Sequence, residues 1–309
     1  MLRFDAIFNL TLLLAVVLSL ATLSGYFSER VGIANISIDG QMIFAALTFC
    51  IFSELIYPVT GDYGFVLPLL LAMVFTLIAS SLFGFLTIRL KTDQIVAGTA
   101  IDMVFLGLAT FLTEPLGPLL SGGKHTKLQS SFLSIGAVSP DSQIYWTTII
   151  IFIVTVIAIV GLFVMMKYTP FGLRLRAIGN NPNAVDAQGI NVTKYQWYAI
   201  SISGLLAGLA GGMYMYSLGG TFVGNVNGYG FLALAILIAG SWKIPFLSII
   251  AFVFAFLTRL FDQLTISANL DRDVAKIIPF AITLVAMIIF SKYNVAPKNI
   301  GIPFDKSKR

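Results

Sequence analysis

The sequence predicts an all-α fold, a polytopic membrane bundle of about nine transmembrane helices in one domain over residues 1–309. Of the 309 residues, 58% are hydrophobic and only 11% are charged, whereas about a quarter of the residues in a soluble domain are charged. Several uncharged stretches reach the roughly 20 residues that cross a bilayer as a helix. One cysteine, Cys50, and one histidine, His125, exclude a disulfide framework, a thiolate cluster and a His-rich zinc site.

The apolar stretches give the predicted spans in chain order: residues 6–28, 31–53, 63–88, 94–113, 142–166, 195–242, 244–264 and 274–291. The stretch 195–242 contains 48 residues without a charge and a turn-rich centre at 219–228. It therefore predicts two spans joined as a helical hairpin, which brings the count to nine. The last two stretches contain Arg259 and Lys276, whose long side chains can snorkel to the interface.

The first stretch has an alternative interpretation as a cleaved signal peptide, because it follows Arg3 and ends near small residues. Its uncharged run of 23 residues exceeds the apolar core of about 7 to 15 residues in such peptides. The length favours a span.

Lysine and arginine set the predicted orientation. If the C-terminus is cytoplasmic, the inner side holds 13 basic residues and the outer side holds five, with Arg259 inside a span. The positive-inside rule favours this arrangement, and an odd number of spans then places the N-terminus outside. Residues 292–309 form a basic cytoplasmic tail in this arrangement, suited to contact with anionic membrane lipids.

Polar residues within two predicted spans suggest a solute pathway. Asn35, Ser37, Asp39 and Gln41 occur together in the second span, and Asp102 lies about 15 Å along its helix from the inner end, near the bilayer midplane. Such side chains are tolerated there only where they face protein or water. We expect these five residues to line a polar path. The alternative is that the two acids are neutral or paired and fix helix packing.

Two further groups have structural interpretations. Gly204, Gly208 and Gly212 recur every four residues and predict the close packing of another helix. Arg259 and Asp262, three residues apart, predict a local ion pair on one helix.

Catalytic motifs are absent from the sequence. It contains no His-Glu-x-x-His, no Gly-x-Ser-x-Gly and no Gly-x-x-x-x-Gly-Lys-Ser/Thr phosphate loop. We therefore expect no enzyme activity, no metal site and no cofactor bound by this chain. If ATP drives transport, a separate subunit binds ATP and Mg²⁺. A channel or a secondary carrier needs no such subunit, and these alternatives stay open on composition alone.

The longest charged connection on the inner side covers residues 167–194. Within it Asn181 can cap a helix that begins at Pro182, and Gly189 can end that helix in the left-handed conformation. The prediction is a short helix of about two turns outside the membrane. The small side chains of Ala184 and Ala187 leave a shallow face on this helix that a partner protein can bind.

Four stretches resemble the permeases of ABC importers for nucleosides, simple sugars and branched-chain amino acids. Residues 169–190 resemble the cytoplasmic coupling segment of that family, and residues 230–245 resemble its late span. Residues 27–42 and 93–102 are similar to segments of its nucleoside branch. Two positions depart from the pattern, because Asp39 stands where Glu is expected and Asp102 where Asn is expected.

The resemblance implies an ATP-driven importer in the plasma membrane of a bacterium, with nucleosides as the solute. The alternatives are an ABC permease for a simple sugar or another small polar solute, and a stand-alone ion-coupled secondary transporter. The departure at Asp39 is conservative, because Asp and Glu carry the same charge. The departure at Asp102 adds a negative charge near the bilayer midplane, and we expect that charge to alter the substrate preference.

The resemblance also implies partners. A separate ATP-binding subunit would grip the short helix through Pro182, Ala184, Asp186, Ala187, Gly189 and Ile190. A second permease subunit, related but different, would enclose the pathway, and an extracytoplasmic solute-binding lipoprotein would deliver the solute. Membrane lipids surround the bundle, and no nucleic acid is expected.

Overall fold

The computed structural model describes residues 4–130, 143–218, 220–267, 281, 285 and 296–305. The helices are α1 (Phe4–Glu29), α2 (Ile38–Thr60), α3 (Val66–Gly84), α4 (Gln94–Ser121), α5 (Gln143–Tyr168), α6 (Pro170–Asn180), α7 (Pro182–Ala187), α8 (Val192–Leu218), α9 (Tyr229–Ala239) and α10 (Ile244–Ser267). Two short helical segments, η1 (Gly61–Phe65) and η2 (Phe85–Arg89), flank α3. The strands β1 (Gln129–Ser130) and β2 (Gly220–Thr221) pair antiparallel. The predicted all-α membrane bundle is confirmed.

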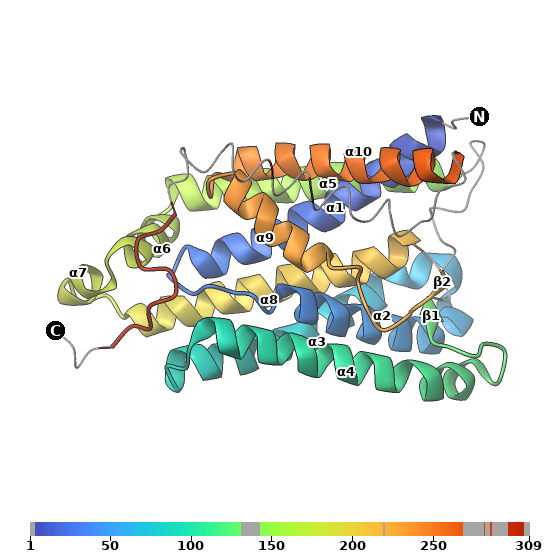
Figure 1. Cartoon of the computed structure of the whole chain (residues 1–309), viewed down its shortest axis with the longest axis horizontal. Helices are drawn as coiled ribbons and strands as arrows, with labels where there is room; N and C mark the ends of the chain where they lie inside the picture. The colour runs from blue at the N-terminus through green and yellow to red at the C-terminus, as the bar shows by residue number, and fades with distance from the viewer. Residues whose placement is uncertain are drawn as a thin grey trace.

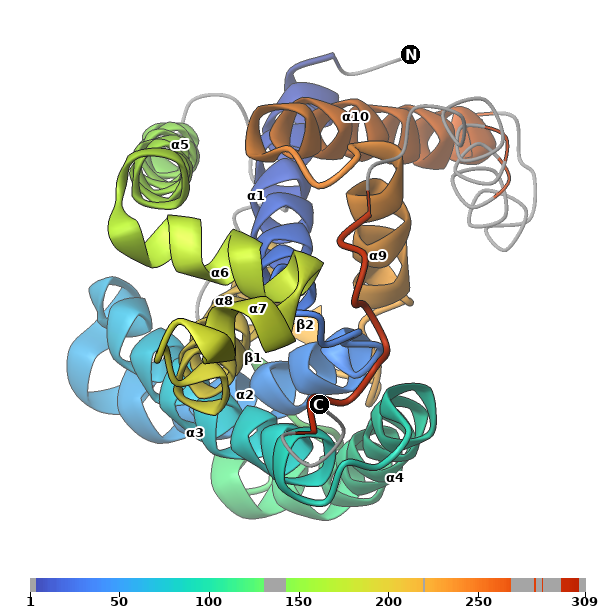
Figure 2. The same cartoon turned by 90° about the vertical axis from the view of Figure 1, so that its left-hand side faces the viewer.

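Helix α8 lies at the centre of the bundle and packs against α1, α2 and α3 (Figure 2). In the apolar window of α1, 83% of the residues are buried, against 11% in α5. Helix α1 is therefore an interior element, while α5 stands at the periphery, where its aliphatic side chains face outward.

Within the described part of the chain, seven helices are long and apolar enough to cross a bilayer: α1, α2, α3 with η2, α4, α5, α8 and α10. Helix α9 has only 11 residues, or about 16 Å, so the second arm of the predicted hairpin is too short to cross alone. It ends in a turn where Ser241 and Trp242 adopt positive φ. Because no charged residue marks this turn, the sequence did not predict it. The predicted span 274–291 lies outside the described residues apart from 281 and 285, so the count of nine stays a prediction.

The chain between α1 and α2 also differs from the prediction of one helix over residues 31–53. Residues 30–37 are turns and irregular backbone, and α2 begins only at Ile38. Figure 1 shows this segment running back into the bundle before α2 starts. Gly32 makes the turn possible because its φ is +83°. Irregular backbone at this depth is tolerated because it is buried in protein.

The two ends of the bundle differ in composition. Helices α6 and α7 and residues 296–305 lie at one end, and the start of α1 lies at the opposite end (Figure 1). Residues 296–305 are held in place by an ion pair of 2.7 Å between Lys91 and Asp305 and by a hydrogen bond of 3.1 Å from Gly301 N to Gly32 O. Basic residues that the sequence analysis assigned to the inner side, among them Lys91 and Arg176, therefore lie at this end.

Candidate functional site

Two helix N-termini meet inside the bundle, those of α2 and α9. A Cβ atom at Gly230 would lie 2.3 Å from the Cα of Asp39, and one at Gly40 would lie 2.6 Å from the Cα of Asp102. Only glycine allows backbones to approach this closely. At this crossing the start of α9 therefore lies against the start of α2, and the start of α2 lies against α4 at Asp102.

Each of the two acids at this crossing caps the N-terminus of a helix to which it does not belong. Asp102 Oδ1 accepts a hydrogen bond of 2.6 Å from Gly40 N, the third residue of α2. Asp39 Oδ1 accepts one of 2.8 Å from Gly230 N, the second residue of α9. Ser37, at the N-cap of α2, makes no capping bond with its side chain. Carboxylates at helix N-termini satisfy free N–H groups and interact favourably with the helix dipole. The acids thus connect α4 to α2 and α2 to α9.

The two acids differ in how far their side chains are exposed. Asp39 is only 7% exposed, and Asp102 is partly exposed. The second oxygen of Asp102, Oδ2, is itself buried and accepts no hydrogen bond within the described residues, and the same holds for Gln41 Oε1. A buried acceptor without a donor is costly. These two atoms are therefore acceptors at the crossing whose hydrogen-bonding capacity the described residues leave unused.

The other polar residues of the second predicted span form a buried chain of hydrogen bonds. Gln41 Nε2 donates to Ser37 Oγ at 2.8 Å, and Ser37 Oγ donates to Asn35 Oδ1 at 2.6 Å. Asn35 Nδ2 donates to Ser203 Oγ of α8 at 3.1 Å, and Ser203 shares a bond of 2.9 Å with Ser24 of α1. All five side chains have 0% exposure. The chain fixes the irregular segment to α1 and α8. Sequence reasoning missed Ser24 and Ser203 because isolated serines in apolar helices carry no distinguishing pattern.

The short helix α7 begins as the sequence predicts. Asn181 Oδ1 accepts a hydrogen bond of 3.1 Å from Ala184 N, Pro182 is the first residue, and Gly189 has a φ of +80°. Ala184, Ala187 and Gly189 are exposed, whereas Pro182 is buried. The exposed face of α7 therefore presents the small side chains of Ala184 and Ala187 beside the amide of Asn183, and Pro182 packs inward.

Helix α6, which precedes α7, was not predicted. Thr169 caps it by accepting a hydrogen bond of 3.3 Å from Gly172 N, and Pro170 occupies its first turn. This Thr-Pro pair is the same start signal as the Asn-Pro pair before α7, and it was available in the sequence. The two other residues predicted to contact the ATP-binding subunit, Asp186 in α7 and Ile190 after it, are only partly exposed. Helix α6 packs against α5 and α8, so α7 stands on a rigid base.

Comparison with known proteins identifies the family. The model of a family described as the permease component of the branched-chain amino acid transport system matches residues 7–287. The chain belongs to this permease family. The match extends from α1 to beyond α10, so it includes the crossing of α2, α4 and α9 as well as α7. The predicted membership of the ABC importer permeases is confirmed.

Curated relatives align with this permease over nearly its whole length. The guanosine ABC transporter permease protein NupQ of Bacillus subtilis is 33% identical over 97% of this chain and 96% of its own. The nucleoside ABC transporter permease protein NupC of Lactococcus lactis is 31% identical over 93% of this chain and 92% of its own. The uncharacterized protein MG121 homolog of Mycoplasma pneumoniae is 35% identical over 96% of both chains. No solved structure matches the permease.

A further polar group beside α9 in this permease was not predicted. Asn227 Nδ2 donates a hydrogen bond of 2.8 Å to the hydroxyl of Tyr214, and Asn225 Oδ1 accepts one of 3.2 Å from Asn227 N. Tyr214 packs edge-on against Tyr229, with 5.6 Å between the ring centroids. The asparagines belong to the stretch 219–228, which the sequence analysis treated only as a turn. Two amides between long apolar segments are the signal that was available.

The three glycines predicted to admit a neighbouring helix face α3 in the permease: Gly204, Gly208 and Gly212. A Cβ atom at Gly208 would lie 2.8 Å from the Cα of Met73. Helices α3 and α8 therefore pack backbone to backbone. The local ion pair is also present, with 3.2 Å between Arg259 Nη1 and Asp262 Oδ2.

Proposed function

We propose that this permease is the membrane subunit of an ATP-driven importer for nucleosides. The observation that carries the proposal is its alignment, over more than nine-tenths of its length, with two permeases named for guanosine and nucleoside transport. A match of this extent covers the whole bundle rather than one shared motif. The chain supplies the solute path, and its partner supplies the ATP hydrolysis.

The proposed path passes the crossing of α2, α4 and α9. Nucleosides carry hydroxyl and amino donors, and the unused acceptor Asp102 Oδ2, on a partly exposed side chain, is suited to them. Gln41 Oε1 is a second unused acceptor, and because its side chain has 0% exposure a solute would reach it only after the helices move apart. Asn35, Ser37 and Asp39 hold the irregular segment and the start of α9 in place, and so complete the polar wall. Asp102 is the residue of this set that is partly exposed, so it is the first candidate for contact with the solute.

The proposed partners follow from the faces that the chain presents. An ATP-binding subunit would contact the exposed small residues of α7 and move α7 together with α6 as one rigid unit. ATP and Mg²⁺ would be bound there. A second permease subunit would enclose the solute path, and a solute-binding lipoprotein would dock at the opposite end of the bundle, which we assign to the outside together with the N-terminus.

Uptake measurements in cells test the function. A strain lacking this gene should lose uptake of labelled guanosine, and expression of the wild-type chain should restore it. Unlabelled nucleosides should compete, whereas ribose and leucine in the same excess should not. Persistent guanosine uptake in the deletion strain, or competition by ribose alone, would contradict the proposal.

A second measurement separates the importer from an ion-coupled carrier. An ionophore that dissipates ion gradients should leave uptake intact while cellular ATP is maintained, and depletion of ATP should abolish it. The carrier alternative requires the reverse result. Co-purification of an ATP-binding subunit with the tagged permease is expected, and its absence would count against the importer.

A further inference from the structure

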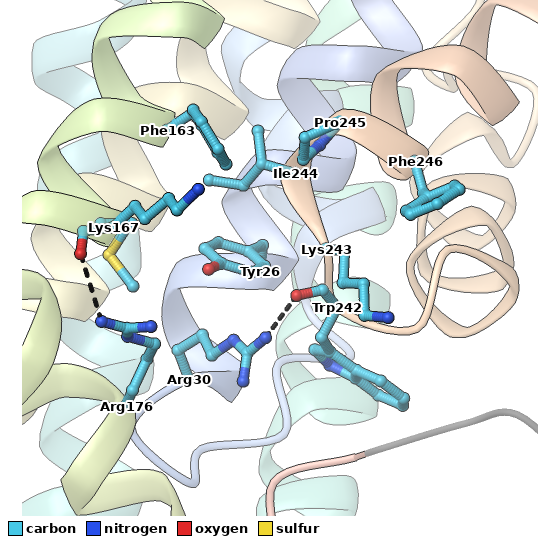
Figure 3. Close-up of a pocket in the computed structure, with 11 residues that line it drawn as sticks. Tyr26, Arg30, Phe163, Lys167, Arg176, Trp242, Lys243, Ile244, Pro245 and Phe246 are labelled. Carbon is cyan, nitrogen blue, oxygen red and sulfur yellow. Dashed lines mark hydrogen bonds between the residues drawn. The ribbon is translucent and has the colours of Figure 1, made fainter.

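A pocket lined by basic residues opens at the α6–α7 end of the bundle. It has a volume of about 290 Å³ and lies between α1, α5, α6 and the turn before α10 (Figure 3). Four basic side chains line it, Arg30, Lys167, Arg176 and Lys243, and none of the described residues in its lining is acidic. Arg30, Lys167 and Arg176 come from separate parts of the chain and lie on one side of the Trp242 carbonyl, whereas the Lys243 ammonium extends to the rim, 5.7 Å from the ring centroid of Phe246 (Figure 3).

The four basic side chains of this pocket form no ion pair within the described residues. Arg30 donates to the main-chain carbonyl of Trp242, and Arg176 donates to that of Lys167 at 3.5 Å. Arg30 Nε is buried without an acceptor. The neighbouring acid Glu29 accepts a hydrogen bond of 2.6 Å from Trp242 Nε1 instead. The pocket therefore offers donors and charge to an anion.

Aromatic side chains surround the charges and place the pocket at the level of lipid headgroups. The guanidinium of Arg30 lies 5.1 Å from the ring centroid of Tyr26, and the ammonium of Lys167 lies 5.4 Å from that of Phe163. Trp242 is also part of the lining. Tyrosine and tryptophan are typical of the interface between the bilayer and water.

An apolar groove follows the pocket along the same helices toward the bilayer centre. It has a volume of about 250 Å³ and is lined by residues of α1, α5 and α10, with Ser19, Ile159 and Ser248 at its near end. On α1, Ser19 is seven residues from Tyr26 of the pocket, a rise of about 10 Å. The outer wall is α5, the least buried span, so the groove is open to the lipid.

We propose that the pocket and the groove together bind one anionic phospholipid, with its phosphate beside Arg30, Lys167 and Arg176, Lys243 at the rim, and an acyl chain in the groove. Basic pockets between transmembrane helices at the cytoplasmic side suit anionic headgroups. A soluble phosphate would occupy the pocket but leave the apolar groove unfilled, so the combination indicates a lipid. Because Arg176 belongs to α6, the bound lipid would tie α6, and through it α7, to α1 and α10. This inference is independent of the solute that the permease carries.

Lipid retention by the full-length permease tests the headgroup. In native mass spectrometry from mild detergent, phosphatidylglycerol should be retained in preference to phosphatidylcholine with the same chains. The double substitution Lys167→Gln and Lys243→Gln should weaken phosphatidylglycerol binding about 25-fold, since each cation contributes about fivefold. The same charge removed at the opposite end, by Lys124→Gln and Lys127→Gln, should leave retention unchanged. Equal retention of both lipids by the wild type overturns the proposal.

A substitution in the groove distinguishes a lipid from a soluble phosphate. Val253 lines the groove and is 46% exposed, so Val253→Trp fills it without disturbing a buried position. It should lower phosphatidylglycerol retention at least fivefold, while Ile78→Trp on α3, at a side chain 63% exposed, should not. Unchanged retention in Val253→Trp, or glycerol phosphate binding as tightly as the lipid, shows a phosphate site and refutes the lipid.

Discussion

Replacing Gly230 with alanine should separate α9 from α2 and so open the crossing on which the candidate site depends. The added Cβ would lie 2.3 Å from the Cα of Asp39 and 2.5 Å from its backbone nitrogen, whereas ordinary contacts begin near 3.4 Å. The two backbones must therefore move apart by about 1 Å. Neither obstructing atom belongs to a flexible side chain, so rotation of a side chain cannot relieve the contact.

Two terms set the size of this effect. Overpacking in a close-packed interior costs about 1–3 kcal/mol. Separation also breaks the hydrogen bond of 2.8 Å from Gly230 N to Asp39 Oδ1, and a hydrogen bond to a charged group contributes about 1.5–3 kcal/mol. Alanine in place of a helical glycine offsets about 0.5–1 kcal/mol of these costs, so we expect Gly230→Ala to lower the free energy of unfolding by about 1.5–5.5 kcal/mol.

Titration of the purified permease with a denaturing detergent measures this change, and nucleoside uptake at matched protein levels measures its functional result. Gly161→Ala in α5 is the control, because a Cβ there meets nothing within 4 Å. It should raise stability by about 0.5–1 kcal/mol, the usual gain on replacing glycine inside a helix. A Gly230→Ala variant within about 0.5 kcal/mol of the wild type would refute the close crossing, since overpacking and the lost hydrogen bond together exceed the helical gain by at least about 1.5 kcal/mol.

Three other substitutions test separate parts of the structure. Asp102→Asn keeps an oxygen for capping Gly40 N but replaces the free acceptor Oδ2 with a donor, so folding should be retained and the KM for uptake should rise; an unchanged KM excludes solute contact at this atom. Gly189→Trp should abolish solute-stimulated ATP hydrolysis in the assembled complex, while the control Gly301→Trp, at an equally open position with φ of +82°, should preserve it. Equal stimulation in both variants would show that α7 is not part of the coupling interface. Gly208→Leu should force α3 from α8 and cost about 3 kcal/mol or more, and a stable variant in a detergent titration would contradict their packing.

The sequence predicted the elements whose signals are local. Apolar length identified the long helices, the Asn181-Pro182 pair and Gly189 identified α7, and the four-residue spacing of glycines identified the tight face of α8. These signals depend only on near neighbours along the chain. Helix α6 was missed although its Thr169-Pro170 start is of the same kind.

The candidate site could be predicted only in part. The sequence indicated polar residues at depth, but it did not indicate that Asp102 caps α2 or that Asp39 caps α9, because each bond joins residues far apart in the chain. Ser203 and Ser24 completed the network around Asn35 without any pattern that marks them. Contacts of this kind depend on how the helices pack.

The sequence by itself determined that this protein is a membrane bundle of the ABC permease family, with its basic residues concentrated on one side and a short helix among them. Composition and short motifs are sufficient for this, because lipid forces apolar segments of spanning length into helices. Only the tertiary structure decided where α2 and α9 begin and what their free N–H groups bind. An uncharged run permits either a full span or a shorter helix with a turn, and the choice depends on whether carboxylates from other helices lie close enough to cap the interrupted ends.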